Sequence, residues 1–319
     1  MSKRGFVGAA LAALLLLGTG PIMAGAATAQ FGSLGNLGRL GARAAAPRLM
    51  SGREPISTSL PDAVWGDPAK DGWAPPGPRR PLTGLRRMAN GGFVLQPGSY
   101  EFHDQSYCLH AGTHGPGGGE GYLYAPPKGS AQDAVMTIVR NSVAHPEIPQ
   151  RTIQTLLWAI VARARFEDLS NEHRLVASQL LSQRQLASLN RSALDVLNSG
   201  PIANNLPSPL REIAQAEAQL RGMFASGASY GELERVAVLS GRVGRGPGSQ
   251  AIPAGRWSQH PDGYWVRYLP VSYTNTVVNI WVPPGSAAIG REYDPAVHIA
   301  VPGDTARQRL IQSGRAYGG

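Results

Sequence analysis

The chain contains very little cysteine, lysine or charge. Among its 319 residues there is one cysteine, Cys108, and charged residues make up 16%. A single cysteine excludes an internal disulfide framework. The three lysines are Lys3, Lys70 and Lys128, a scarcity that fits an arginine-favouring genome or a chain that avoids its own reactive amines. No apolar run after the first residues is long enough to span a bilayer, so we expect no transmembrane segment in the mature chain.

Residues 1–29 are typical of a secretory signal peptide. Lys3 and Arg4 precede an apolar stretch over residues 6–17, and small residues follow as far as Ala29. This pattern predicts export, to the periplasm, the cell surface or the medium. Outside the cytoplasm an unpaired thiol is buried, bonded to another chain or chemically committed. The fate of the single cysteine is therefore the main question that the sequence raises.

Composition divides the rest of the chain into four segments. Residues 30–91 are rich in Gly, Pro and Arg and are predicted to form a disordered arm. Residues 92–169 combine short strands with helices, and 170–241 have helical periodicity. Residues 250–319 contain strand-like runs of aromatic and β-branched residues. The expected fold class is α+β, with a short-strand module packed on helices, a helical insertion and a small β-rich C-terminal part.

The net charge of +9 does not predict a nucleic-acid partner, because the arginines of the arm are not interleaved with aromatic residues. Aromatic residues gather instead in the C-terminal part, where residues 264–268 and 277–282 are expected to form two paired strands. Alternation places Tyr264 and Tyr268 on one face of the first strand and Trp265 on the other. Packing is the default role for these rings, and a carbohydrate platform is the alternative.

A helix is predicted to begin near Pro149. Its apolar stripe includes Ile153 and Leu157, and a turn of about 100° per residue places Gln154 at the edge of that stripe. Trp158 lies one turn further along the same flank. We therefore expect a semi-buried glutamine beside an indole.

Cys108 and Gln154 together have the groups needed for a thioester. The sulfur replaces the side-chain amide nitrogen, which leaves as ammonia, and the reaction requires the two groups to be held together. A dry aromatic wall then slows hydrolysis of the product.

The motifs around these two residues are Tyr107-Cys108-Leu109, a loop containing Pro116-Gly117, and the helix Ile153-Gln154-Thr155-Leu156-Leu157-Trp158. With this order and a Cys-to-Gln separation of 46 residues (154 − 108), residues 92–169 resemble the thioester domains of bacterial surface adhesins. In that family the triplet is aromatic-Cys-apolar and the helix reads Thr-Gln-x-Ala-apolar-Trp. Ile153 and Leu156 depart from the usual threonine and alanine.

The resemblance implies an internal thioester between Cys108 and Gln154, shielded by Tyr107 and Trp158. It further implies covalent attachment to an amine or hydroxyl of a surface protein or glycan on a cell or matrix. Such capture is a single-turnover adhesion reaction rather than catalysis, and it implies no cofactor and no metal.

Two other interpretations of Cys108 remain open. It is an inert buried residue of a non-enzymatic envelope or matrix protein, since a lone cysteine often packs as a small hydrophobe. Alternatively, it is the nucleophile of a Cys-His thiol hydrolase. The candidate bases are His103, His110, His114 and His145.

Overall fold

The computed structural model describes residues 54–198, 208–241 and 243–318. The predicted signal peptide, residues 1–29, and the arm as far as residue 53 lie outside this part. Within the described residues, no helix is both long and apolar enough to cross a bilayer.

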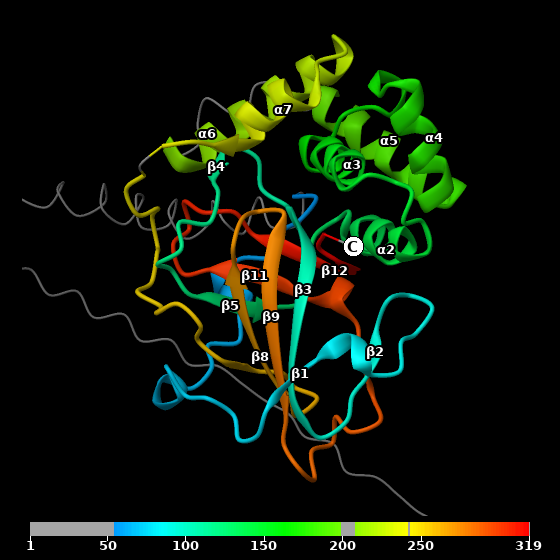
Figure 1. Cartoon of the computed structure of the whole chain (residues 1–319). Coiled ribbons are helices and arrows are strands. Elements are labelled where there is room, and N and C mark those ends of the chain that lie inside the picture. The colour runs from blue at the N-terminus through cyan, green and yellow to red at the C-terminus, as the bar shows by residue number, and fades with distance from the viewer. Residues whose placement is uncertain (1–53, 199–207, 242, 319) are drawn as a thin grey trace, which may run out of the picture. The chain divides into compact units, whose positions relative to one another are not determined.

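Six antiparallel strands close into a β-barrel (Figure 1). Each strand pairs with the next, and the last returns to the first. In order around the barrel they are β3 (Gly98–Cys108), β12 (Leu310–Ala316), β11 (Ile299–Pro302), β5 (Tyr122–Ala125), β8 (Trp265–Pro270) and β9 (Asn275–Val282).

Six short strands lie beside the barrel strands or form separate pairs. β1 (Arg79–Pro81) runs parallel to β3, and β7 (Ser258–Gln259) runs antiparallel to β8. The remaining four form two small ladders. These are β2 (Phe93–Val94) with β10 (Glu292–Tyr293), and β4 (Thr113–His114) with β6 (Val238–Leu239).

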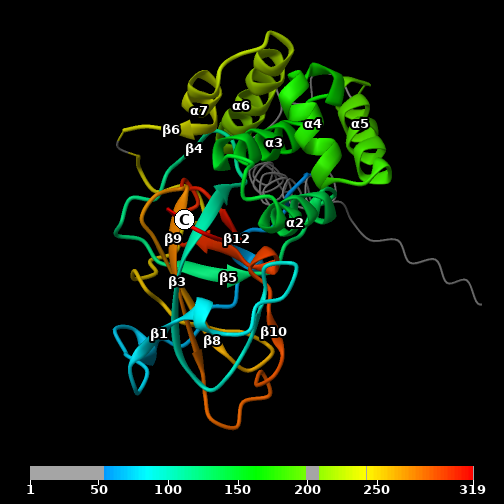
Figure 2. The same ribbon diagram turned by 45° about the vertical axis from the view of Figure 1, so that its right-hand side comes forward.

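The helices are inserted between β5 and β6 and gather over one end of the barrel (Figure 2). α3 is buried from Thr152 to Ala162, which its apolar composition on all sides favours. It packs against β3 and the surrounding helices. The helices are α2 (Gln132–Asn141), α3 (Gln150–Ala162), α4 (Asn171–Leu180), α5 (Gln183–Asn198), α6 (Ser208–Ala225) and α7 (Tyr230–Ala237).

Two hydrophobic clusters follow from the alternation of side chains along the strands. One fills the barrel and includes Tyr100, Tyr124 and Val266. The other joins the outer face of the sheet, through residues such as Leu123 and Ile311, to the helices. The barrel is therefore packed on its inside and covered by helices on part of its outside.

The expected fold class was wrong. The short strands of residues 92–169 and those of the C-terminal part do not form separate units, because β3 pairs directly with β9 and β12. The predicted pairing of residues 264–268 with 277–282 is confirmed by the antiparallel β8–β9 ladder. The C-terminal strands thus complete one closed barrel whose first long strand carries Cys108.

The predicted disordered arm is also wrong for residues 54–91, which form ordered turns and strand β1. Val64 donates its N–H to the carbonyl of Tyr124 at 2.8 Å, and its own carbonyl accepts from Ser258 Oγ at 2.8 Å. Gly66 has φ +71° and lies so close to the barrel that a Cβ there would be 1.8 Å from the Trp257 carbonyl oxygen. This segment lacks long apolar runs, yet it is held by backbone pairing and by close packing at glycine.

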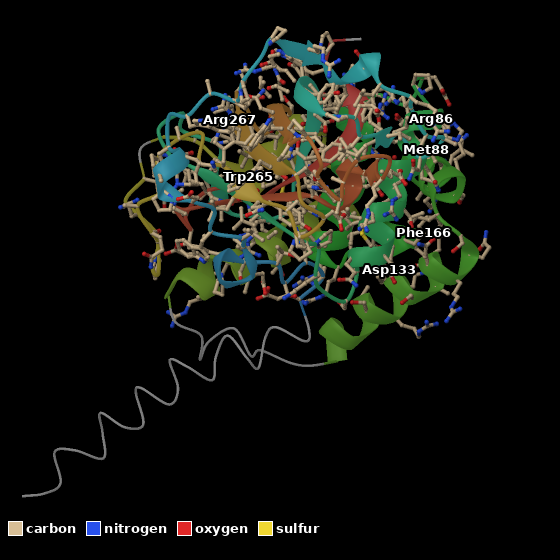
Figure 3. The ribbon with its side chains drawn as sticks, turned by 90° about the horizontal axis from the view of Figure 1, so that it is seen from below. Arg86, Met88, Asp133, Phe166, Trp265 and Arg267 are labelled. Atoms are coloured by element: carbon tan, nitrogen blue, oxygen red, sulfur yellow. The ribbon has the colours of Figure 1, made fainter. Side chains whose placement is uncertain are left out.

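The alternation predicted for the first C-terminal strand is present in β8. Tyr264, Val266 and Tyr268 belong to the barrel interior. Trp265 and Arg267 lie on the same outer side (Figure 3). There Trp265 belongs to a cluster of three indole rings. The ring centroid of Trp281 lies 6.4 Å from that of Trp265 and 4.7 Å from that of Trp73. These rings pack residues 68–73 against the barrel.

A buried carboxyl group lies inside the barrel wall at Asp104 of β3. β12 bulges between Gln312 and Ala316, and its Ser313 hydroxyl and Gly314 N–H donate to Asp104 Oδ1 at 3.2 and 3.0 Å. Asp104 Oδ2 has no partner among the described residues. Burial raises the pKa of Asp104 from 3.8 to about 8, and the hydrogen bonds only partly oppose this rise.

The native state therefore holds a proton on Asp104 that the unfolded chain releases above its ordinary pKa of 3.8. Stability should fall as the pH rises from about 4 to about 8. We expect Asp104→Asn to match wild type near pH 4 and to exceed it by roughly 2–4 kcal/mol at pH 8. Urea unfolding across this pH range checks the difference, with the exposed Glu212→Gln as control. A constant difference between wild type and Asp104→Asn would contradict it.

Candidate functional site

The site begins where β3 extends beyond its neighbour β9. The ladder between them runs from Gly98 opposite Val282 to Gln105 opposite Asn275, and β9 begins there. On its other side, β3 continues to pair with β12, and Leu109 donates to the Arg309 carbonyl at 3.0 Å. Since backbone groups alternate sides along a strand, the N–H and C=O of Cys108 face the side that β9 no longer covers.

α3 supplies the missing partner for this part of the strand (Figure 2). Cys108 N–H donates to Gln154 Oε1 at 2.9 Å, and Gln154 Nε2 donates to the Cys108 carbonyl at 3.1 Å. One turn earlier, Gln150 Nε2 donates to the carbonyls of Ser106 at 3.2 Å and Thr274 at 2.7 Å. Two glutamines at i and i+4 therefore continue the ladder with side-chain amides.

The predicted helix from Pro149 is thus present, and Gln154 is more deeply buried than its position at the edge of the stripe indicates. Its side chain is 0% exposed, as are those of Cys108 and Trp158. α6 and α7 also pack against this helix, and the apolar stripe in the sequence does not predict these contacts. A buried primary amide needs partners for its oxygen and nitrogen, and the backbone of Cys108 provides one for each.

The thiol of Cys108 lies in a dry setting. Burial raises its pKa above the ordinary value, so the neutral thiol dominates at neutral pH. The Trp158 indole N–H opposes this rise, and it has no nitrogen or oxygen acceptor among the described residues. The predicted neighbourhood of cysteine, glutamine and tryptophan is therefore assembled in the fold.

Tyr230, which the sequence did not identify, packs against Trp158 and is linked to two further side chains. The ring of Tyr230 lies 5.3 Å from the indole, centroid to centroid. Its hydroxyl is 2.9 Å from that of Tyr273, which donates to Glu234. All three are half-buried, and the pKa of Tyr230 is raised by burial to about 12. Tyr230 and its partners therefore form a hydrogen-bonded group beside Trp158.

Tyr107 does not shield the sulfur in the predicted way. It precedes Cys108 in a regular part of β3, where it pairs with Ile311 while Cys108 pairs with Leu310. Successive side chains of a strand point to opposite faces, so the Tyr107 ring lies on the other face. Its hydroxyl donates to Gln105 Oε1 at 3.1 Å. Trp158 and Tyr230, rather than Tyr107, form the wall beside the thiol.

Two of the four candidate histidines lie against carboxylates rather than against Cys108. His103 is exposed and lies 3.5 Å from Glu101, and His145 lies 2.9 Å from Glu147. The groups that shift the pKa of Cys108 include no histidine. Among the described residues, no three His, Cys, Asp or Glu side chains are placed to hold a metal ion.

The arrangement places a backbone N–H donor on the carbonyl oxygen of a buried side-chain amide. The Cys108 N–H polarises the amide carbonyl, as donors do in an oxyanion hole, and the sulfur belongs to the same residue as that donor. Comparisons of the chain with protein-family models, with curated proteins and with solved structures give no match.

The paired hydrogen bonds also predict a stability effect that is separate from any chemistry at sulfur. In a Cys108→Ala background, we expect Gln154→Ala to lower the free energy of unfolding by about 2–4 kcal/mol, because it leaves a buried N–H and C=O without partners. Gln150→Ala, in the same background, should cost less because its site is half-buried. Urea unfolding measures both, and equal small losses would contradict the assigned role of Gln154.

Proposed function

We propose that the protein is an exported adhesin-like protein that forms an internal thioester between Cys108 Sγ and Gln154 Cδ. The thioester attaches the chain covalently to an amine or hydroxyl on a surface protein or glycan. The observation that carries this proposal is the pair of hydrogen bonds of 2.9 and 3.1 Å between the Cys108 backbone and the Gln154 amide.

Formation of the bond is balanced within the two side chains. Cys108 Sγ attacks Gln154 Cδ, the C–N bond breaks, and the thiol proton leaves with the nitrogen as ammonia. The Cys108 N–H binds the carbonyl oxygen as negative charge develops on it. The Cys108 carbonyl accepts a hydrogen bond from the nitrogen that departs. Positioning by the fold replaces an external acid or base.

Capture of the target follows the reverse chemistry with a different nucleophile. A target amine or hydroxyl attacks Gln154 Cδ, the C–S bond breaks, and the nucleophile's proton passes to Cys108 sulfur. The raised pKa of Cys108 keeps the released thiol neutral.

The few lysines of the chain are consistent with an amine-reactive bond. Lys70 Nζ lies over the rings of Trp73 and Trp265, at 4.5 and 4.9 Å from their centroids. Lys128 Nζ lies 2.7 Å from Asp62 Oδ1. Lys3 belongs to the predicted signal peptide. Both described lysines therefore contact residues other than Gln154.

A second candidate is a non-enzymatic envelope or matrix protein in which Cys108 is inert. The same hydrogen bonds favour it, because an uncovered strand end needs a cap whether or not the sulfur reacts. The two candidates differ in covalent structure: the first lacks one ammonia and a thiol that the second retains.

Intact mass of the purified mature chain tests this difference. We expect the wild type to be lighter than its sequence by one ammonia and to show no thiol when denatured at mildly acidic pH with an alkylating reagent. Cys108→Ala and Gln154→Ala should have their full sequence masses, and Gln150→Ala, the matched glutamine control, should still lose ammonia. Methylamine added to the wild type should produce its own adduct and release one thiol. A full-mass wild type with one thiol per chain would leave only the structural candidate.

The wall over Trp158 predicts the lifetime of the bond. We expect Tyr230→Ala to increase the rate of thioester hydrolysis about tenfold or more, because water then reaches the dry pocket. Time-resolved mass spectrometry follows the gain of one water. Tyr317→Ala, which removes an exposed ring elsewhere, is the control, and equal rates in the two variants would exclude Tyr230 from the wall.

A further inference from the structure

A separate cleft lies on the outer side of the barrel. It is bounded by residues 59–65, the loop 247–250 and residues 301–309, and its volume is about 440 Å³. This is within the range of sites that take a small molecule. None of its lining residues belongs to the Cys108 site.

Two arginines line this cleft and have donors without partners. Arg309 Nη1 and Arg307 Nε are buried and make no hydrogen bond among the described residues. Arg307 Nε lies 3.8 Å from Asp304 and 3.9 Å from Glu120, and Arg307 Nη1 donates to the Gly115 carbonyl at 2.8 Å, so its charge is offset and its position fixed. Arg309 forms no ion pair with a described carboxylate. A buried guanidinium donor without a partner is costly and favours an anionic acceptor in the cleft.

The acids near Arg309 are already engaged. Asp62 forms an ion pair with Lys128 at 2.7 Å and accepts a hydrogen bond from the Ser59 N–H at 2.9 Å. Burial raises the pKa of Glu54, and the charges of Glu54 and Arg309 oppose the effect of burial on each other's pKa. Among the described residues, Arg309 therefore keeps a positive charge in the cleft with no carboxylate at ion-pair distance.

The rim of the cleft adds an apolar surface and an amide. Trp65 is 45% exposed, which is unusual for the largest side chain and leaves a flat ring face open to a ligand. Gln250 is exposed beside it. A bare inorganic anion fills only a small part of 440 Å³ and makes no use of the indole. A sugar ring with one carboxylate uses the arginine, the ring face and the amide together.

We propose that this cleft binds an acidic sugar, with the carboxylate on Arg309 and the sugar ring against Trp65. Arg307 contributes a second donor and Gln250 contacts ring hydroxyls. The site is independent of the thioester, because it uses a different face of the chain and no atom of Cys108 or Gln154. It provides reversible recognition of a glycan surface.

Isothermal titration of the mature protein with sodium glucuronate tests the proposal. We expect a dissociation constant on the order of millimolar, with glucose and sulfate each binding at least tenfold more weakly. Arg309→Gln and Trp65→Ala should each weaken glucuronate binding about tenfold. The controls are Arg79→Gln, which removes an exposed charge on β1, and Tyr317→Ala, whose ring is also 45% exposed; neither should change binding.

Each alternative outcome has a defined meaning. Glucose binding as tightly as glucuronate would remove the role of Arg309, and sulfate binding as tightly would remove the role of the ring. Binding unchanged in Trp65→Ala, an exposed position whose loss does not threaten folding, would also overturn the site. Cys108→Ala should bind like wild type, so a failed thioester and a failed sugar site give different results.

Discussion

The hydrogen-bond requirement of one strand end governs the relation between the barrel and its helices. β3 continues for three residues after β9 begins, and a buried peptide edge without partners is unfavourable. α3 meets this requirement with the amides of Gln150 and Gln154 rather than with another strand. The same contact holds α3 on the barrel and brings the Gln154 amide to the backbone of Cys108, the only cysteine of the sequence.

Local features of this fold were predictable from the sequence, and closure of the barrel was not. The helix carrying Gln154 and Trp158 depends on apolar spacing within one segment, and the β8–β9 hairpin joins neighbouring strands. The pairs β3–β12 and β5–β11 join residues about two hundred positions apart along the chain. No pattern within either segment specifies such a partner. Residues 54–91 were mispredicted for the same reason, because their order comes from contacts with distant strands.

The candidate site shows the same division. Cys108, Gln154 and Trp158 were identifiable from their residue types and spacing. The misplacement of Tyr107 follows from ignoring strand alternation, which puts adjacent side chains on opposite faces. Tyr230, Glu234 and Tyr273 were missed because they come from α7 and the loop before β9 and meet only in the folded chain. A tyrosine and a glutamate one helical turn apart were the available signal, but nothing local linked them to Cys108.

The short segment before and at the start of β12 connects the two proposed activities without mixing their environments. Leu310 lies opposite Cys108 and packs inside the barrel, while the preceding Arg309 lines the outer cleft. A thioester requires exclusion of water, whereas a sugar site exchanges with it. Because successive side chains point to opposite faces, Arg309 faces the cleft and the next residue, Leu310, faces the barrel interior. The two proposed sites therefore differ in solvent access, although Arg309 and the Cys108 partner Leu310 are adjacent in the sequence.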